Sequence, residues 1–222
     1  MIVVLFGTES MAKRPGPSEP LETTGENPVR ARILDAAFSA FTEAGYAHTS
    51  TLEIATRAGV SKRDLYALVG NKQQILASCI ARRAERLRVP ADLPQPHDRA
   101  TLEQVLISLG TRLLQETTDP IAVAVFRLAI AEAMHAPEVA HTLDSIGRET
   151  VRAALRQVMT HAQSSGLLHG RASEMAEQFA GLLWGDLLVS QLLRVTEPPS
   201  PRELTRRAKA ATASVLQLYG SS

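Results

Sequence analysis

The sequence contains one cysteine among its 222 residues, few aromatic residues and no long apolar run. A single cysteine excludes an internal disulfide framework and is typical of proteins of a reducing cytoplasm. Aromatic residues make up 4% of the chain, so a core drawn from its 45% hydrophobic residues consists mostly of Leu, Ala and Val. That composition favours packed helices over a β-sandwich. No apolar segment approaches the length that crosses a bilayer, so we expect a cytoplasmic protein without a membrane partner.

Residue patterns that carry catalysis or bind metals are also missing. The six histidines have no metal-ligand spacing and no second cysteine to join them: His48, His97, His135, His141, His161 and His169. No phosphate-binding loop, nucleophile elbow or paired-glycine fingerprint occurs. Cys79 shares a helical stripe with Ile75, Leu76 and Ile80, which predicts a buried, inert thiol rather than a redox sensor. We therefore expect no enzyme, no cofactor and no metal site.

The positive charge is concentrated in one segment, although the whole chain carries a formal charge of only +1. Residues 28–88 hold ten Lys or Arg against five Asp or Glu, whereas residues 89–222 hold twelve against fourteen. A basic segment of this kind suits a phosphate-binding surface. Ordinary variation in surface charge would give a similar excess, so the pattern requires a motif to support it.

The segment 49–66 supplies that motif, because it has the pattern of two short helices joined by a tight turn. Ser50 and Ser61 each precede an acidic residue by three positions, which is the spacing of a helix cap and its capping box. Gly59 stands where a helix end requires a left-handed backbone. The predicted inward side comprises Leu52, Ile54, Ala55, Ala58, Leu65 and Leu68. The second helix opens on two cations, as in a DNA-reading helix-turn-helix.

The stretch ILDAAFSAFTEAGYAHTSTLEIATRAGVSKRDLYALVGNKQQILASCI, residues 33–80, resembles the N-terminal domain of the TetR/AcrR family of transcriptional regulators. The stretch FRLAIAEAMHAPEVA, residues 126–140, resembles the C-terminal domain of the AefR-like subgroup. The resemblance implies an all-α protein, in which a three-helix DNA-binding domain with a helix-turn-helix precedes a helical domain for ligand binding and dimerisation. It also implies that the partner is double-stranded DNA.

Matching positions imply DNA contacts for named residues. Ser50 and Thr51 match a hydroxyl pair that touches phosphate, Tyr66 matches a tyrosine that donates to a phosphate, and Lys72 matches a lysine that anchors the backbone. Lys62 and Arg63 match positions that reach base edges or phosphates. We expect Arg63 to read a base, because an arginine bidentate to guanine is worth about 1–3 kcal/mol of discrimination.

Two positions depart from the family pattern. Asp64 stands where small residues are common, and it is expected to partner Ser61 at the helix start. The alternative for Asp64 is a contact to a cytosine amino group. Val69 replaces a usual aromatic residue, which should weaken the packing beneath the second helix without abolishing DNA binding.

The rest of the chain divides at proline-rich and polar segments. Residues 1–26 are expected to form a disordered tail, whose native start, Met1 or Met11, the sequence leaves open. Residues 27–88 form the DNA-binding domain, 89–99 a linker that cannot continue a helix, and 100–222 the second domain. The remaining predicted helices span 28–44, 72–88, 120–135, 137–165, 173–194 and 201–219, with another around residues 102–113.

The last two predicted helices suggest a second copy of the chain as partner. The helix 173–194 is apolar on nearly all sides, and Leu204, Ala208, Ala211, Val215 and Leu218 form a packing seam on the last helix. We expect a homodimer through these two helices, with a monomeric helical bundle as the alternative. Two recognition helices on a two-fold axis would read a palindromic operator.

A small apolar ligand is expected to bind inside the second domain and to regulate DNA binding. The candidate lining is Phe126, Ile130, Met134, Met159, Trp184 and Leu188, although such residues also form ordinary cores. The polar residues Asp186, Ser190 and Gln191 either bind ligand or satisfy one another and a dimer partner. The sequence thus predicts a ligand-released repressor, with a ligand-independent or architectural DNA-binding protein as the alternative.

Overall fold

A computed structural model describes residues 27–88 and 95–220, and those residues form helices joined by short loops. The N-terminal part contains α1 (Pro28–Ala44), α2 (Thr51–Ala58), α3 (Lys62–Val69) and α4 (Lys72–Ala84), and a 3₁₀ turn at Glu85–Leu87 extends α4. The remaining helices are α5 (Arg99–Thr118), α6 (Pro120–Glu132), α7 (Pro137–Thr142), α8 (Glu149–Ser164), α9 (Ala172–Trp184), α10 (Leu187–Leu193) and α11 (Pro201–Tyr219). The predicted all-α class is confirmed.

Three helices begin with a capping residue followed by proline. Asn27 Oδ1 accepts from the backbone nitrogen of Val29 at 2.9 Å, and Asp119 Oδ1 accepts from that of Ile121 at 2.9 Å. Ser200 Oγ caps α11 in the same way. Proline at the first helical position sacrifices no hydrogen bond, so these caps start α1, α6 and α11 cleanly.

Two long helices differ from their predicted form. The helix predicted over 137–165 contains a π-helical segment, Leu143–Arg148, between α7 and α8. The helix predicted over 173–194 is broken into α9 and α10 at Gly185. The backbone of Gly185 has φ 47° and ψ −126°, a conformation that is incompatible with a continuous helix. At its other end, α9 begins at Ala172, one residue before the predicted start, and its N-cap residue Arg171 makes no side-chain capping bond. Apolar periodicity continued through both sites and hid the interruptions.

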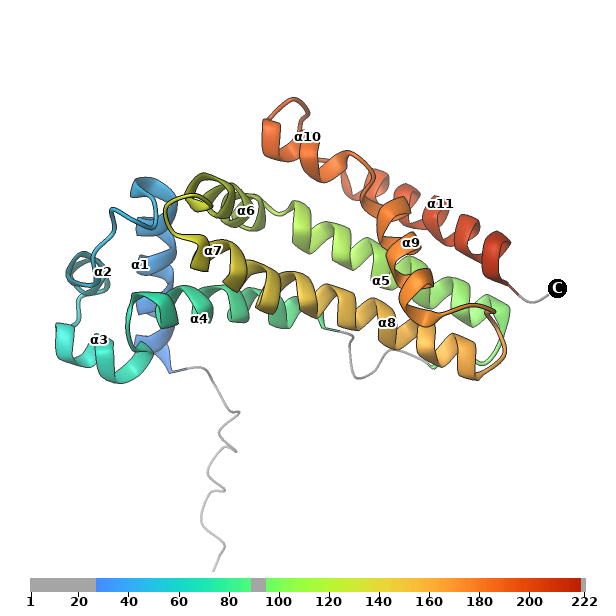
Figure 1. Ribbon diagram of the computed structural model, residues 1–222, viewed down its shortest axis with the longest axis horizontal. Coiled ribbons are helices and arrows are strands. Elements are labelled where there is room, and N and C mark those ends of the chain that lie inside the picture. The colour runs from blue at the N-terminus through green and yellow to red at the C-terminus, as the bar shows by residue number, and fades with distance from the viewer. Residues whose placement is uncertain (1–26, 89–94, 221–222) are drawn as a thin grey trace, which may run out of the picture.

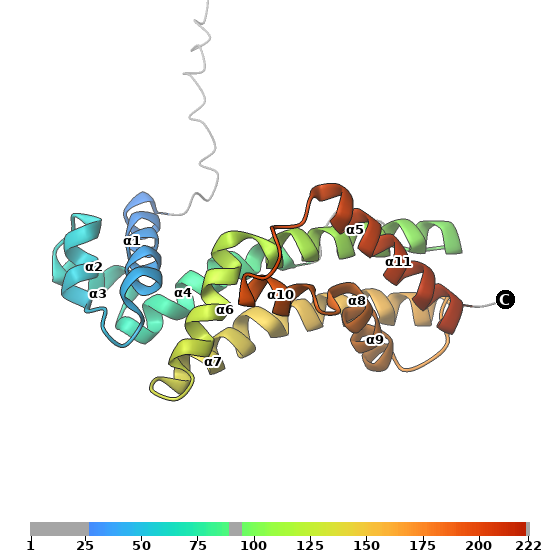
Figure 2. The same ribbon diagram turned by 90° about the horizontal axis from the view of Figure 1, so that it is seen from above.

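The buried residues form two clusters, and the boundary between the clusters does not coincide with the predicted linker between the domains. One cluster joins α1–α4 to Val125, Leu128 and Ala129 of α6 and to Val139 of α7. The other is built from α5, α8, α9 and α11. Figures 1 and 2 both place α1–α3 at one end of an elongated molecule and α11 toward the other, with α6 and α7 between them. The α6–α7 region therefore packs directly against the N-terminal helices.

Parts of several sequence predictions lie outside the described residues. The tail 1–26, including both candidate starts, is one of them, and most of the linker, residues 89–94, is another. Within the described residues, no helix combines the length and the apolarity that a membrane crossing requires.

Candidate functional site

The α2–turn–α3 unit is held in shape by side-chain caps. Ser50 Oγ accepts from the backbone nitrogen of Glu53 at 3.1 Å, and Ser61 Oγ accepts from that of Asp64 at 3.0 Å. Gly59 ends α2 in the left-handed conformation, with φ 63° and ψ 40°. The reciprocal half of the predicted Ser50 capping box is absent, because the Glu53 carboxylate pairs with Arg57 at 2.9 Å instead.

The inner side of this unit is anchored in the N-terminal core, with one exception. Ile54, Ala58, Leu65 and Val69 are buried, so Val69 takes part in the packing beneath α3. Leu52, however, is 60% exposed, which makes its predicted inward position wrong. The reason is geometric: Leu52 is the second residue of α2, and the face that α2 buries carries Ile54, Ala55 and Ala58.

The outer side of α3 presents cations and a tyrosine to solvent. Lys62 and Arg63 are exposed in the first turn, and Tyr66 is 44% exposed one turn later. The Tyr66 hydroxyl lies 3.3 Å from Thr51 Oγ1, and Lys62 Nζ lies 5.9 Å from the centre of the Tyr66 ring. The structure therefore gathers Thr51, Lys62, Arg63 and Tyr66 on one surface formed by α2 and α3.

Asp64 adopts the first of its two expected roles in the geometry. Its Oδ2 accepts a hydrogen bond of 2.6 Å from the Ser61 hydroxyl, while its own backbone nitrogen donates to the same hydroxyl. The carboxylate thereby stabilises the start of α3, where the helix dipole favours negative charge.

Lys72 is more engaged with protein than the sequence suggested. Its Nζ donates to the Ala47 carbonyl at 3.1 Å and lies 4.4 Å from the centre of the Tyr46 ring. Partial burial lowers the pKa of Lys72, and the negative charges of Glu132 and Glu138 oppose that shift. Asn71 and Gln74 form a complete capping box beside it, so the start of α4 is rigidly defined.

Glu132 is a residue whose role the sequence did not reveal. It ends α6, is buried, and its Oε1 accepts from the backbone nitrogen of Ala47 at 3.1 Å. Ala47 belongs to the loop between α1 and α2, so α6 holds the segment that leads into the α2–turn–α3 unit. A carboxylate in a largely apolar helix was the available signal, because such a group must find a partner when buried.

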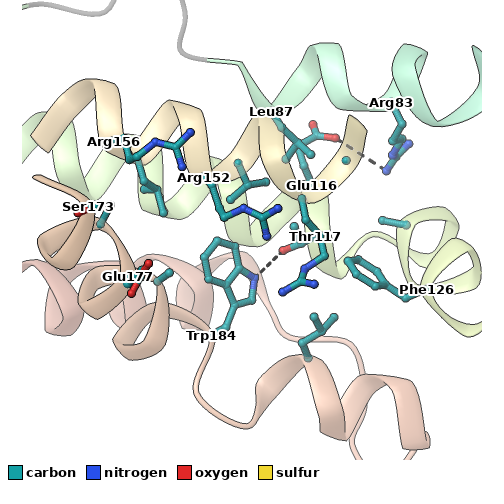
Figure 3. A pocket seen from close by; sticks show the side chains of 18 residues that line it. Arg83, Leu87, Glu116, Thr117, Phe126, Arg152, Arg156, Ser173, Glu177 and Trp184 are labelled. Carbon is teal, nitrogen blue, oxygen red and sulfur yellow. Dashed lines mark hydrogen bonds and ion pairs between the residues drawn. The ribbon is translucent and has the colours of Figure 1, made fainter. Parts of the chain in front are cut away.

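A cavity of about 370 Å³ lies on the other side of α6 (Figure 3). Its apolar wall contains Leu87, Phe126, Val151, Leu155, Trp184 and Leu188. The indole nitrogen of Trp184 donates to Thr117 Oγ1 at 2.9 Å, which fixes the ring against α5. This volume lies in the range of sites that bind drug-sized molecules.

The cavity contains half of the residues predicted to line it. Phe126, Trp184 and Leu188 line it, whereas Ile130, Met134 and Met159 do not. Ile130 and Met134 are 62% and 87% exposed at the far end of α6 and beyond it, and Met159 is buried in the core. Helical spacing places these residues on one face of their own helix but says nothing of which neighbour that face meets.

The predicted seam on α11 packs within the chain. Leu204, Ala208, Ala211 and Val215 are buried in the cluster that includes α5, and of the five seam residues only Leu218 is exposed. The side chain of the buried residue Gln191 donates to Thr196 Oγ1 and the Glu197 carbonyl, both at 2.9 Å, and Asp186 lies 3.7 Å from Arg207. These two polar side chains thus find partners inside one chain.

Known proteins resemble most of this chain. Residues 104–221 match the C-terminal domain of AefR-like transcriptional repressors, and residues 33–79 match the bacterial regulatory proteins of the tetR family. The chain belongs to the TetR family. It is therefore a DNA-binding transcriptional regulator, and its relatives are regulators rather than enzymes.

Individual relatives agree with that membership. The HTH-type transcriptional repressor KstR of Rhodococcus jostii (strain RHA1) is 29% identical over 130 residues, an alignment that spans 58% of this chain and 58% of that repressor. A TetR transcriptional regulator from Agrobacterium tumefaciens is 28% identical, with a TM-score of 0.74 over 89% of this chain and 97% of its own. The flavonoid-responsive regulator FrrA is 27% identical, with a TM-score of 0.71 over 86% and 97%.

Within the described residues of this TetR-family regulator, no group of His, Cys, Asp or Glu side chains is arranged to hold a metal ion. Cys79 is buried, its Sγ donates to the Leu34 carbonyl at 3.4 Å, and burial raises its pKa to about 12.

Proposed function

We propose that this protein is a dimeric repressor, located in the cytoplasm, that binds a palindromic operator and is released by a small apolar ligand. Residues 27–88 act as the DNA-binding domain, 89–99 as the linker and 100–222 as the ligand-binding and dimerisation domain. The proposal rests chiefly on the outer surface of α3, where Lys62, Arg63 and Tyr66 are exposed on a helix whose inner side is buried. A capped helix with an exposed cationic start is suited to the major groove.

In this proposal the DNA contacts divide into two kinds. Arg63 reads base edges, because its exposed guanidinium can bind guanine with two hydrogen bonds. Ser50, Thr51, Lys62, Tyr66 and Lys72 contact phosphates and position the helix. Asp64 contributes indirectly by holding the start of α3 through Ser61.

Gel-shift titrations with DNA upstream of the protein's own gene, and with random DNA of equal length, test this division. Arg63→Ala should lose about 1–3 kcal/mol on the specific site and little on random DNA. Tyr66→Phe and Lys72→Ala should weaken both complexes by similar factors. Arg171→Ala is the control, because that arginine is exposed at the start of α9, away from α2 and α3. No sequence preference at moderate salt would instead favour an architectural DNA-binding protein.

The dimer is supported by exposed apolar side chains on α9, α10 and α11. Leu182, Val189, Leu193 and Leu218 are between 40% and 66% exposed, and apolar side chains on neighbouring elements suit a helix-packing interface. Light scattering should give twice the 24.0 kDa chain mass for the native protein. Leu182→Glu with Leu218→Glu should shift the mass toward one chain, whereas Ile130→Glu, an equally exposed apolar site on α6, should not. A single-chain mass for the native protein would overturn the dimer.

Ligand release is supported by the cavity beside α6, the helix that also holds the α1–α2 loop through Glu132. A relative named for its response to flavonoids shows that one member of this fold responds to an organic molecule. Loss of the specific gel shift on addition of one compound, with no effect on random DNA, is the expected result. If no compound that binds the cavity changes DNA affinity, the release mechanism is wrong.

A further inference from the structure

The cavity wall carries more positive charge than an apolar ligand needs. Besides its apolar residues, it is lined by Arg83, Arg148, Arg152 and Arg156 and by the acidic residues Glu116 and Glu177. The side chains of Arg148, Arg152 and Arg156 are 59%, 38% and 42% exposed, and each pairs with a carboxylate. The N–H donors that these pairs leave unused bear on the chemistry of the ligand, on the premise of the proposed function that a ligand binds here.

Arg83 is neutralised within the protein. Its Nη2 lies 2.5 Å from Asp119 Oδ1 and 3.8 Å from Glu116 Oε2, so two carboxylates face one guanidinium. Figure 3 shows Arg83 and Glu116 at one end of the cavity and Arg156 at the other. The other three arginines of the wall lie at the end formed by the π segment and α8, and Glu177 of α9 is the remaining acidic residue of the wall.

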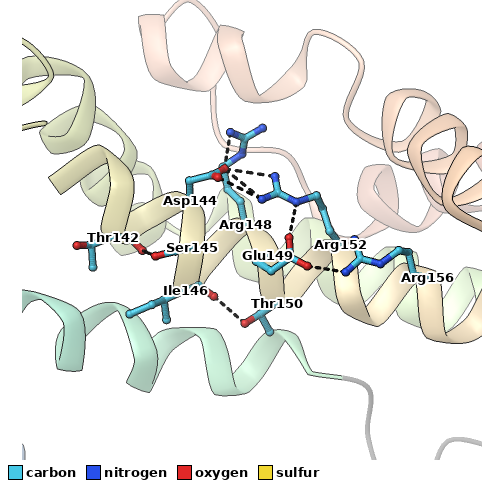
Figure 4. Close-up of polar contacts among 9 residues, drawn as sticks. All are labelled: Thr142, Asp144, Ser145, Ile146, Arg148, Glu149, Thr150, Arg152 and Arg156. Atoms are coloured by element: carbon cyan, nitrogen blue, oxygen red, sulfur yellow. Dashed lines mark hydrogen bonds and ion pairs between the residues drawn. The ribbon is translucent and has the colours of Figure 1, made fainter. Parts of the chain in front are cut away.

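At that end, arginines and carboxylates alternate in a ladder (Figure 4). Asp144 accepts from Arg148 at 2.9 Å and from Arg152 at 3.2 Å. Glu149 accepts from Arg152 at 2.8 Å and from Arg156 at 2.5 Å. Hydrogen bonds from Arg152 hold the pKa of Asp144 below its usual value, and those from Arg156 and Arg152 do so for Glu149. Both carboxylates are thus ionised at neutral pH, and the ladder has three cations and two anions.

The cavity is lined by the cations of the ladder and not by its anions. Arg148, Arg152 and Arg156 line it, whereas Asp144 and Glu149 do not. Among the described residues, Arg148 bonds a carboxylate only through Nη1, and Arg156 only through Nη2. Each guanidinium has five N–H donors, so both retain donors for a further acceptor. Asp144 and Glu149 hold the arginines from outside the cavity wall, and the remaining N–H donors of Arg148 and Arg156 are available to a bound molecule.

We propose that the ligand is an amphipathic carboxylate, with its apolar body between Phe126 and Trp184 and its carboxylate on one of the two arginines that retain donors, Arg148 or Arg156. An anion completes the charge balance of the ladder, and a carboxylate matches the planar geometry that these guanidiniums already present to Asp144 and Glu149. A neutral ligand of the same shape makes no charge-assisted hydrogen bond to these arginines, which therefore add less to its binding.

Trp184 makes the proposal directly measurable, because it is the only tryptophan of the chain and lies in the cavity wall. The probes are straight-chain carboxylates of eight to fourteen carbons, each paired with the primary alcohol of equal length, added below their aggregation limits to the full-length protein. Changes in Trp184 emission give the dissociation constants. A hydrogen-bonded charge predicts about tenfold to a hundredfold tighter binding of the carboxylate within the best-bound pair.

Arg148→Gln with Arg156→Gln should reduce that ratio to less than about threefold and leave alcohol binding unchanged. Arg171→Gln is the matched control, because this arginine pairs with Glu174 at 3.1 Å and does not line the cavity. Circular dichroism and thermal unfolding establish that the variants are folded. Equal binding of both members of every pair, binding of neither, or a preference that survives the double substitution overturns the inference.

The same titrations in the presence of operator DNA separate this inference from the proposed function. Carboxylate binding without release of DNA supports the ligand class and refutes release. Release of DNA by an uncharged compound that competes for the cavity more strongly than any carboxylate supports release and refutes the ligand class.

Discussion

Coupling between α6 and the loop before α2 can be tested by a double-mutant cycle on Gly45 and Glu132. Gly45 has φ 88° and ψ 157°, a conformation that is nearly restricted to glycine, so Gly45→Ala should cost about 1–3 kcal/mol in strain. A Cβ at this position would also lie 3.0 Å from Glu132 Oε1, which is tighter than an ordinary contact. That same oxygen accepts the hydrogen bond from Ala47, so the new methyl group displaces it.

The single variant Glu132→Ala removes a hydrogen bond to a charged acceptor, which is worth about 1.5–3 kcal/mol. In the double variant the methyl group no longer meets a carboxylate, and the hydrogen bond is already gone. The destabilisation should therefore be less than the sum of the single effects by about 1 kcal/mol, within the range seen for residues in contact. Urea unfolding monitored by circular dichroism, at one protein concentration for all variants, measures the three differences.

Gly59→Ala provides the matched control. Gly59 also has a positive φ, 63°, but a Cβ built on it meets nothing within 4 Å. Its cost should be conformational strain alone and should add to that of Glu132→Ala within about 0.3–0.5 kcal/mol. Additivity of Gly45→Ala and Glu132→Ala to the same tolerance would refute the contact and, with it, the view that α6 holds this loop.

Two further predictions concern buried groups. Burial raises the pKa of Cys79 to about 12, so about one thiol in ten thousand is ionised at pH 8. The folded protein should therefore react with 5,5′-dithiobis(2-nitrobenzoic acid) only over hours. A reaction rate equal to that of the urea-unfolded chain would contradict this prediction. Both Thr117 and Thr118 donate a hydroxyl hydrogen bond of 2.7 Å to a backbone carbonyl, but only Thr117 also accepts from the indole of Trp184. Thr117→Val should therefore destabilise the protein by about 1 kcal/mol more than Thr118→Val, and it should shift the emission of Trp184. Equal destabilisation with unchanged emission would show that the indole bond is absent in solution.

Features that depend on neighbours three or four residues apart were predictable from the sequence. The caps at Ser50 and Ser61 and the left-handed Gly59 all appear where the residue types indicated them. The exposed side of α3 follows from the same local periodicity. The resemblance to the family was also recognised from these local positions, because the caps, glycines and apolar residues mark the helix ends and inward faces of a known fold.

Features that depend on distant neighbours were not predictable. The exposure of Leu52 and the internal packing of the α11 seam depend on which surface each helix meets, and periodicity does not specify that. The break at Gly185 interrupts an apolar pattern that continues on both sides. For the same reason, only some of the predicted ligand-binding residues line the cavity: Phe126 and Trp184 do, whereas Met134 lies on the surface.

The chain's local chemistry alone therefore determined that it is helical, that it carries a helix-turn-helix, and which side of that motif faces outward. Only the tertiary structure brought Glu132 onto a loop 85 residues earlier in the chain. Only the fold, likewise, set a ladder of arginines against an apolar cavity and left its carboxylates outside. The physical reason is that caps and helical faces are set by backbone geometry over one turn, whereas the partner of a buried charge is chosen by the packing of whole helices.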